Sequence, residues 1–269
     1  MHDFLTAFQA IDPVALSIGP LQVRWYGLAY AAGFVCAFFL MKHFAKRWKT
    51  GLSVDDLLTI VLYAVIGVIL GGRLGYCLFY GQGYYFTHPL EVFAIWDGGM
   101  SFHGGFIGIL IGGYLASRSV KTSFLTIADL GSIGAPIGFG LGRLANFING
   151  ELWGRVTTSS WGLVFAGAGP SPRIPSQLIE AALEGLLLFI IMFIMAMKKP
   201  PFKRGTLIGT LAILYGCFRI FAEFFREPDV GLGFLAGDWL TMGMLLSIPM
   251  VIGGIAFVIW VSRQKSSSK

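Results

Sequence analysis

The sequence has 269 residues, of which 55% are hydrophobic and only 13% are charged, and its mean hydropathy is +0.73. A soluble domain carries about a quarter charged residues, so this composition excludes an ordinary soluble protein and indicates a chain that lies mostly in lipid. The net charge of +6 does not indicate nucleic-acid binding, because the basic residues lie in short loops between apolar segments and report membrane topology.

The N-terminal segment precedes the first apolar stretch and lacks the basic start of a cleavable signal peptide. We expect it to be amphipathic or irregular. The three cysteines, Cys36, Cys77 and Cys217, lie far apart in apolar stretches, and the four histidines show no metal-ligand spacing. The sequence therefore predicts neither a disulfide framework nor a metal site.

A membrane-spanning helix needs about 20 mostly apolar residues. Seven segments satisfy this requirement, although the third is short and rich in glycine. They are residues 21–41, 54–80, 100–117, 125–149, 176–197, 206–226 and 239–261. Since the chain shows no repeat of fixed period, we expect an all-α polytopic bundle of about seven transmembrane helices, in a single domain over residues 1–269.

Basic residues mark alternate loops. The loops after the first, third, fifth and seventh segments hold 13 of the 20 lysines and arginines, including every lysine. The positive-inside rule then places the N-terminus outside and the C-terminus in the cytoplasm. This arrangement needs an odd number of spans, in agreement with seven.

Several polar side chains lie inside or at the ends of these spans, where a charge costs about 2.5–3.5 kcal/mol on insertion scales. They are Arg73, His103, Arg143, Asn146, Glu151, Arg219 and Glu223. In the predicted orientation, Arg143, Arg219 and His103 all lie near the outer surface, as does Tyr26. A carrier more often places its polar site near the midplane, so this level favours a site open to one leaflet.

Helical spacing groups two of these sets. Arg143, Asn146 and Gly150 are separated by three and four residues, which predicts one helix face. Tyr215, Arg219 and Glu223 are each four apart and predict another. We expect the two faces to point into one cavity.

Each of these features also has a structural interpretation. Arg219 and Glu223 could form only an intrahelical ion pair, and His103 could be a hydrogen-bonded structural residue. Arg73 follows two glycines and is expected to pair with a carbonyl or to extend to the membrane surface. The Gly104-Gly105 pair could serve helix packing or the close approach of a ligand.

Residues 142–154 read GRLANFINGELWG and place an arginine, two asparagines and a glutamate at a membrane edge. This stretch resembles the signature of the prolipoprotein diacylglyceryl transferase family, G-R-x-x-N-F-x-N-x-E-x-x-G, at every fixed position. Further segments resemble the family in the same order along nearly the whole chain. They are Trp25-Tyr26-Gly27, Phe102-His103-Gly104-Gly105, Pro175-Ser176-Gln177-Leu178, and Tyr215-Gly216 with Arg219, Glu223 and Arg226.

The chain departs from the family in one place. The family pattern near residues 173–180 is R-H-P-x-Q-x-Y-E, and here Ile174 and Ile179 stand where histidine and tyrosine would be. No polar role is therefore expected at these two positions.

The resemblance implies an enzyme of the bacterial inner membrane with its active site towards the periplasmic side. It implies transfer of the diacylglyceryl group of phosphatidylglycerol to the lipobox cysteine of a preprolipoprotein, giving a thioether and glycerol 1-phosphate. The thiol belongs to the substrate, and the phosphodiester is itself the activated donor. The implied reaction therefore needs no cofactor.

The implied roles suit the residue types. A histidine can accept the proton of a thiol, so His103 is expected to be the base. The alternative is that the arginines and Glu223 polarise the phosphate and activate the thiol, while His103 only positions the lipid. Guanidinium groups bind phosphate, so Arg143 and Arg219 are expected to neutralise the leaving group. The catalytic set is then His103, Arg143, Arg219 and Glu223. The expected substrate-binding set is Tyr26, Arg143, Asn146, Glu151, Gly154 and Tyr215.

Three other functions stay open at this point. A lipid or anion transporter would use the same arginines to bind a headgroup, with polar groups on both sides of the midplane. A scaffold would keep the ion pairs for structure alone. A different phospholipid-using transferase is the nearest enzymatic alternative.

Overall fold

The computed structural model describes residues 11–19, 21–198, 203–228 and 233–264. The chain separates into two compact units, unit 1 formed by residues 1–40 and 131–269 and unit 2 formed by residues 41–130. The single domain expected from the sequence stays a prediction. Lys199, Lys265 and Lys269 of the basic loops lie outside the described residues.

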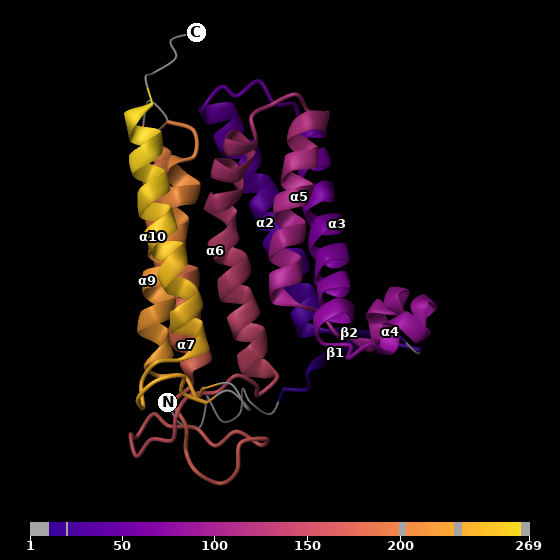
Figure 1. Ribbon diagram of the computed structural model, residues 1–269, viewed down its shortest axis with the longest axis vertical. Coiled ribbons are helices and arrows are strands. Elements are labelled where there is room, and N and C mark those ends of the chain that lie inside the picture. Colours follow the sequence, from indigo (N-terminus) through magenta and orange to yellow (C-terminus); the bar gives the residue numbers. More distant parts are fainter. Residues whose placement is uncertain (1–10, 20, 199–202, 229–232, 265–269) are drawn as a thin grey trace. The chain divides into compact units, whose positions relative to one another are not determined.

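Each of the seven predicted spans forms a helix whose ends lie within about six residues of the prediction (Figure 1). The helices are α2 (Trp25–Arg47), α3 (Val54–Phe79), α5 (Phe102–Ser119), α6 (Phe124–Ile148), α9 (Thr206–Glu223), α10 (Met242–Arg263) and a continuous run of three elements, α7 (Ser176–Glu180), the π-helical η3 (Ala181–Leu187) and α8 (Leu188–Met197). Among the described residues, six helices are long and apolar enough to cross a membrane, and α5 is not among them. The all-α membrane bundle is confirmed. The orientation, and α5 as a seventh span, stay predictions.

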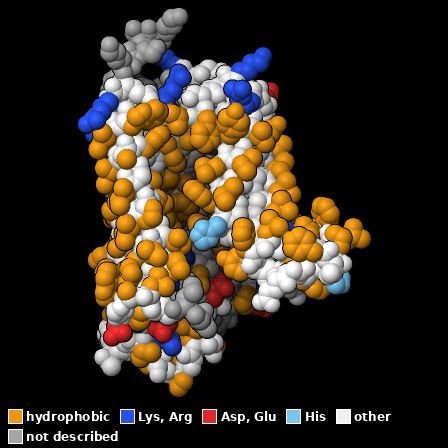
Figure 2. Space-filling model, in the orientation of Figure 1, with side chains coloured by type: hydrophobic (Ala, Val, Ile, Leu, Met, Phe, Trp, Pro, Cys, Tyr) orange, Lys and Arg blue, Asp and Glu red, His pale blue; other side chains and the backbone are white. Residues whose placement is uncertain are grey.

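Lipid-facing side chains distinguish this bundle from a soluble one. Hydrophobic side chains cover the sides of the helices (Figure 2). On α10, Ile252 and Trp260 expose 63% and 54% of their surface. Large apolar side chains at such exposure fit a hydrocarbon surrounding.

The start of the first predicted span was wrong. Residues 21–24 do not begin the helix; they form β2 (Leu21–Arg24), which pairs antiparallel with β1 (Val14–Ile18). Gln22 and Arg24 alternate with apolar residues, which is the period of a strand rather than of a spanning helix. Helix α2 starts at Trp25, whose indole N–H donates to the carbonyl of Asp12 at 2.9 Å.

Unit 2 is held together by glycines at the contact of α3 and α5. A Cβ atom on Gly71 would lie 2.3 Å from the carbonyl oxygen of Gly104, and one on Gly67 would lie 2.3 Å from that of Gly108. Only glycine allows backbones to approach this closely. The helix-packing interpretation is therefore confirmed for Gly104, whereas a Cβ on Gly105 would meet only ordinary contacts at 3.6 Å and beyond.

Arg73 joins α3 to the segment that contains α4 (Tyr84–Thr87), η1 (Pro89–Phe93) and η2 (Ile95–Asp97). Its side chain is buried and donates to the carbonyl oxygens of Glu91, Val92 and Gly98 at 2.6–2.8 Å. The prediction that Arg73 pairs with carbonyls is confirmed. The role of this arginine is to fix the connection between α3 and α5.

Unit 1 brings α6, the α7–η3–α8 run, α9 and α10 together. A Cβ atom on Gly185 would lie 2.6 Å from the Cα atom of Gly140, so η3 and α6 approach closely at this point. Near the start of α9 and the end of α10, the Lys203 ammonium donates to the carbonyl oxygens of Ser262 and Gln264 at 2.7 and 2.5 Å. The basic loop after the fifth predicted span and the basic segment after the seventh therefore lie at the same end of unit 1, as the alternating-loop pattern predicts.

Candidate functional site

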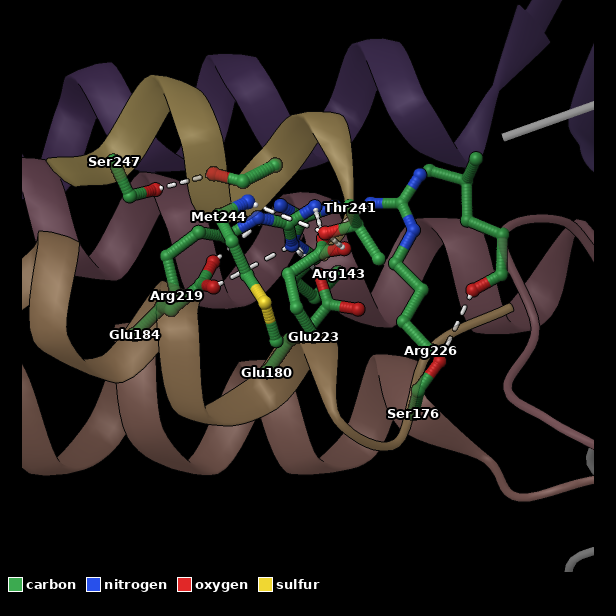
Figure 3. A network of polar contacts seen from close by, with 12 residues as sticks. Arg143, Ser176, Glu180, Glu184, Arg219, Glu223, Arg226, Thr241, Met244 and Ser247 are labelled. Atoms are coloured by element: carbon green, nitrogen blue, oxygen red, sulfur yellow. Dashed lines mark hydrogen bonds and ion pairs between the residues drawn. The ribbon is translucent and has the colours of Figure 1, made fainter. Parts of the chain in front are cut away.

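Six charged side chains of unit 1 form one cluster, which we call the charged cluster (Figure 3). Its members are Arg143 of α6, Glu180 of α7, Glu184 of η3, Arg219 and Glu223 of α9, and Arg226 just after α9. With all groups ionised, three guanidinium and three carboxylate groups carry no net charge. Burial of charge is tolerated only when ions are paired in this way.

Glu180 lies between the two predicted arginines. Its Oε2 atom is 2.8 Å from Nε of Arg143 and 2.6 Å from Nη1 of Arg219. Glu184 contacts the same two groups at longer range, 3.4 Å from Nη2 of Arg143 and 3.6 Å from Nη1 of Arg219. The two helix faces predicted to share one site do bring Arg143 and Arg219 to the same pair of carboxylates. That these faces line a cavity stays a prediction.

The arginines and the glutamates differ in exposure. The side chains of Arg143 and Arg219 are 17% and 12% exposed, whereas those of Glu180 and Glu184 are fully buried. Part of both arginine side chains is therefore accessible, whereas the side chains of Glu180 and Glu184 are not. An anion that reached this part of the charged cluster would meet the arginines rather than these two carboxylates.

Glu223 connects the charged cluster to α10. Its Oε1 atom pairs with Nη2 of Arg219, four residues earlier, so the predicted intrahelical ion pair is formed. Its Oε2 atom accepts a 2.6 Å hydrogen bond from the hydroxyl of Thr241, which also caps α10 by accepting from the amide of Met244. A Cβ atom on Gly243 would lie 2.5 Å from Oε1 of Glu223, so a larger residue there would displace this carboxylate.

The signature segment continues from α6 into a folded loop. Oε1 of Glu151 accepts hydrogen bonds from the side-chain amides of Asn146 and Asn149 at 2.9 and 3.1 Å. The buried Gln177 donates to the main-chain carbonyl of Glu151 at 2.6 Å. The predicted binding residues Asn146 and Glu151 thus contact each other, and Gln177 fixes them to the start of α7.

Backbone geometry explains why two positions of the signature segment are glycine. Gly150 was expected on the same helix face as Arg143, and this was wrong, because α6 ends at Ile148 and Gly150 adopts a φ of +64°. That backbone conformation ends the helix and favours glycine. Gly154 lies between two chain segments, and a Cβ atom there would lie 2.4 Å from the carbonyl oxygen of Ile174 and 2.5 Å from that of Phe225.

The remaining predicted residues lie in different places. Tyr215 is on α9 with Arg219, and its ring packs on Phe139 of α6 with centroids 5.0 Å apart. Tyr26 is at the start of α2, with its hydroxyl 3.3 Å from that of Tyr30. His103 is exposed at the start of α5, in unit 2, and its ring contacts that of Phe102. The structure thus gathers every predicted site residue except His103 within unit 1.

Sequence reasoning missed Glu180 and Glu184. A signal was present, because they are the acidic residues of an otherwise apolar span, lie four apart, and have no basic residue within that span. The cost of placing a charge in the membrane applies to them as it does to the arginines. Glu180 also stands at the last position of the family pattern quoted for residues 173–180.

Known proteins resemble this chain over most of its length. The sequence model of the prolipoprotein diacylglyceryl transferase family matches residues 13–260. Curated proteins named phosphatidylglycerol--prolipoprotein diacylglyceryl transferase are similar over almost the full length. The one from Oleidesulfovibrio alaskensis is 51% identical over 93% of each chain, and the one from Geobacter sulfurreducens is 50% identical over 96% of this chain and 98% of its own. The one from Methylocella silvestris is 51% identical over 98% of each chain.

Proposed function

The chain belongs to the prolipoprotein diacylglyceryl transferase family, and on this premise we propose that its charged cluster binds the phosphate of phosphatidylglycerol during transfer. The protein is a multi-pass membrane transferase that moves the diacylglyceryl group of phosphatidylglycerol to prolipoproteins. The transporter alternative is not favoured, because the relatives are named as transferases over almost the whole chain.

One observation carries the assignment of the phosphate site. Arg143 and Arg219 come from different helices, contact the same Glu180 oxygen, and are both more exposed than that carboxylate. Two guanidinium groups held side by side can each donate to a phosphate oxygen. A scaffold that used these residues only for structure has no need to leave both arginines accessible.

The proposed transfer step is a displacement at the diacylglyceryl carbon. The cysteine sulfur of the lipobox forms a bond to that carbon, and the bond from the carbon to the phosphate oxygen breaks with its electron pair on the oxygen. Glycerol 1-phosphate leaves, and the proton of the thiol passes to a base and then to the phosphate. The leaving phosphate gains negative charge, so Arg143 and Arg219 stabilise the transition state more than the bound lipid.

The other expected residues have supporting roles in this proposal. His103 accepts the proton of the thiol, directly or through water. Tyr26, Asn146, Glu151 and Tyr215 contact the glycerol headgroup, and Glu223 holds Arg219. Gly154 serves the site by letting the loop that carries Glu151 close. We place the active site at the periplasmic side of the bacterial inner membrane.

The test is a transfer assay with purified full-length protein in vesicles that contain headgroup-labelled phosphatidylglycerol. A lipobox peptide with its cysteine, and the same peptide with serine, are added in parallel. We expect labelled glycerol phosphate and a diacylglyceryl thioether only with the cysteine peptide. Movement of lipid between leaflets without release of glycerol phosphate would contradict the proposal and favour a transporter.

A further inference from the structure

Glu180 and Glu184 have no role in the reaction as proposed so far, yet they contact both arginines that bind the phosphate. Both side chains are fully buried. The Oε1 atom of Glu180 has no hydrogen-bond partner among the described residues, and that of Glu184 lies 3.6 Å from Nη1 of Arg219, beyond hydrogen-bond distance. A buried carboxylate whose oxygens are incompletely hydrogen-bonded is costly, so a purely structural reason for the pair is weak.

The local backbone explains how the two carboxylates reach α6. Residues Ala181–Leu187 form a π-helical segment, and short π segments within α-helices are frequent at functional sites. The close contact of Gly185 with Gly140 brings this segment against α6, three residues before Arg143. The sequence thus combines a π segment and two glycines to place Glu184 and Glu180 beside one guanidinium group.

The positions of the nitrogen atoms show what the carboxylates do to the arginines. Arg143 reaches the two glutamates through Nε and Nη2, and Arg219 reaches them through Nη1. A guanidinium group is planar and carries five N–H donors, so fixing some of its nitrogens fixes the direction of the rest. Glu180 therefore sets both the separation and the orientation of the two groups. Without it, two like charges in a weakly screened site would move apart.

Charge balance gives the carboxylates a second effect. Because the charged cluster is neutral as a whole, its attraction for the singly charged phosphodiester of a bound lipid is moderate. The attraction grows when the phosphate gains charge in the transition state. Removal of one carboxylate charge leaves the cluster more positive, and so does not weaken its attraction for the lipid or for the more negative transition state. A fall in kcat without a rise in KM therefore reports lost positioning of the arginines rather than lost charge.

We propose that Glu180, assisted by Glu184, is a positioning residue. It holds the guanidinium groups of Arg143 and Arg219 at the separation and orientation that one phosphate group requires. This inference rests on the proposed function, because it concerns the same phosphate. The role is indirect, since Glu180 acts through the arginines and is not expected to touch the lipid.

The test compares Glu180→Gln and Glu180→Asp with the wild-type protein in vesicles of phosphatidylglycerol and phosphatidylcholine. Release of glycerol phosphate gives kcat and KM for phosphatidylglycerol, and thermal unfolding gives the folded fraction. We expect Glu180→Gln to lower kcat by about 10²-fold, similar to the loss of one preorganised donor, while KM does not rise. Glu180→Asp keeps the charge and is expected to recover part of kcat.

Glu227→Gln is the matched control. This residue pairs with Arg173 at 3.3 Å, is 43% exposed and lies outside the charged cluster, so its kcat and KM are expected to stay within twofold of wild type. A Glu180→Gln protein with wild-type kcat and KM per folded molecule would overturn the proposal. Absence of glycerol phosphate with the wild-type protein would instead reject the proposed function.

Glu184→Gln covers the case in which Glu180→Gln does not fold. Its contacts are longer, so folding is expected to tolerate the change while kcat falls about 10-fold with KM not raised. A double variant with Arg219→Lys adds a second readout. If the glutamate acts through Arg219, the double variant loses less than the product of the two single losses. Unchanged kinetics for Glu184→Gln, or full multiplicativity, would overturn the proposal.

Discussion

The hydroxyl of Thr241 donates a 2.6 Å hydrogen bond to the buried carboxylate of Glu223, which joins the end of α9 to the start of α10. The same hydroxyl accepts from the amide of Met244 and caps α10. A single threonine therefore supports both a helix terminus and the carboxylate that holds Arg219.

Thr241→Val is expected to lose both contacts while keeping the shape of the side chain. Loss of a helix cap costs about 1 kcal/mol, and Glu223 would also lose the hydrogen bond from Thr241, so we expect a lower Tm and a lower kcat. Thr241→Ser retains the hydroxyl and serves as the control, with Tm and kcat close to wild type. Equal Tm values for the valine and serine variants, measured by thermal unfolding in vesicles or detergent, would contradict this role.

The helices could be predicted from the sequence, because the length of an apolar segment is a local property. The pairing of Arg219 with Glu223 could also be predicted, since it depends on a spacing of four residues within one helix. The contact of Arg219 with Glu180 could not, because the two residues are 39 positions apart and lie on different elements. Their meeting depends on the packing of α7 and η3 against α9, which no local pattern showed.

The start of the first helix was missed for a related reason. A hydropathy window counts Leu21 and Val23 as part of the span, but pairing of β2 with β1 determines where the chain leaves the strand. The position of Gly150 was missed because a regular helical period was extended past the end of α6. In both cases the error lies at a boundary, where turn geometry determines the structure.

Arg219→Lys tests whether the planar fork of Arg219 is needed or only its charge. Arg219 contacts Glu180 through one nitrogen and Glu223 through another, and a lysine ammonium cannot hold the same geometry. We expect kcat to fall by about 10²–10³-fold in the glycerol phosphate assay. Arg118→Lys is the control. Arg118 lies in the last turn of α5, outside the charged cluster, and this variant is expected to keep wild-type activity. Wild-type kcat in Arg219→Lys would show that charge alone is sufficient.

Gly154→Ala tests the close contact in the signature loop. The added methyl group would lie within 2.5 Å of two carbonyl oxygens, so the loop must shift, at a cost of about 1–3 kcal/mol for an overpacked position. We expect a lower Tm and reduced activity, because the loop carries Glu151. Gly131→Ala is the matched control, since a Cβ atom at that helical glycine meets nothing within 4 Å. The expected order of Tm is Gly131→Ala equal to or above wild type, and Gly154→Ala below it.

His103→Gln tests the proposed base. His103 is exposed in unit 2, so its substitution is expected to leave Tm nearly unchanged and to act on the reaction alone. If the imidazole accepts the proton of the thiol, the loss is expected to be about 10²–10⁴-fold in kcat. The fall of kcat/KM towards low pH that a histidine base produces is also expected to disappear.

The pH profile separates a base from a residue that only positions the lipid. A positioning role predicts a raised KM for phosphatidylglycerol with the acid limb of the profile retained. An unchanged rate and an unchanged profile would remove His103 as the base. Proton transfer would then be assigned to the polar groups around Arg143 and Arg219, where the Glu180 and Glu184 variants provide the next measurement.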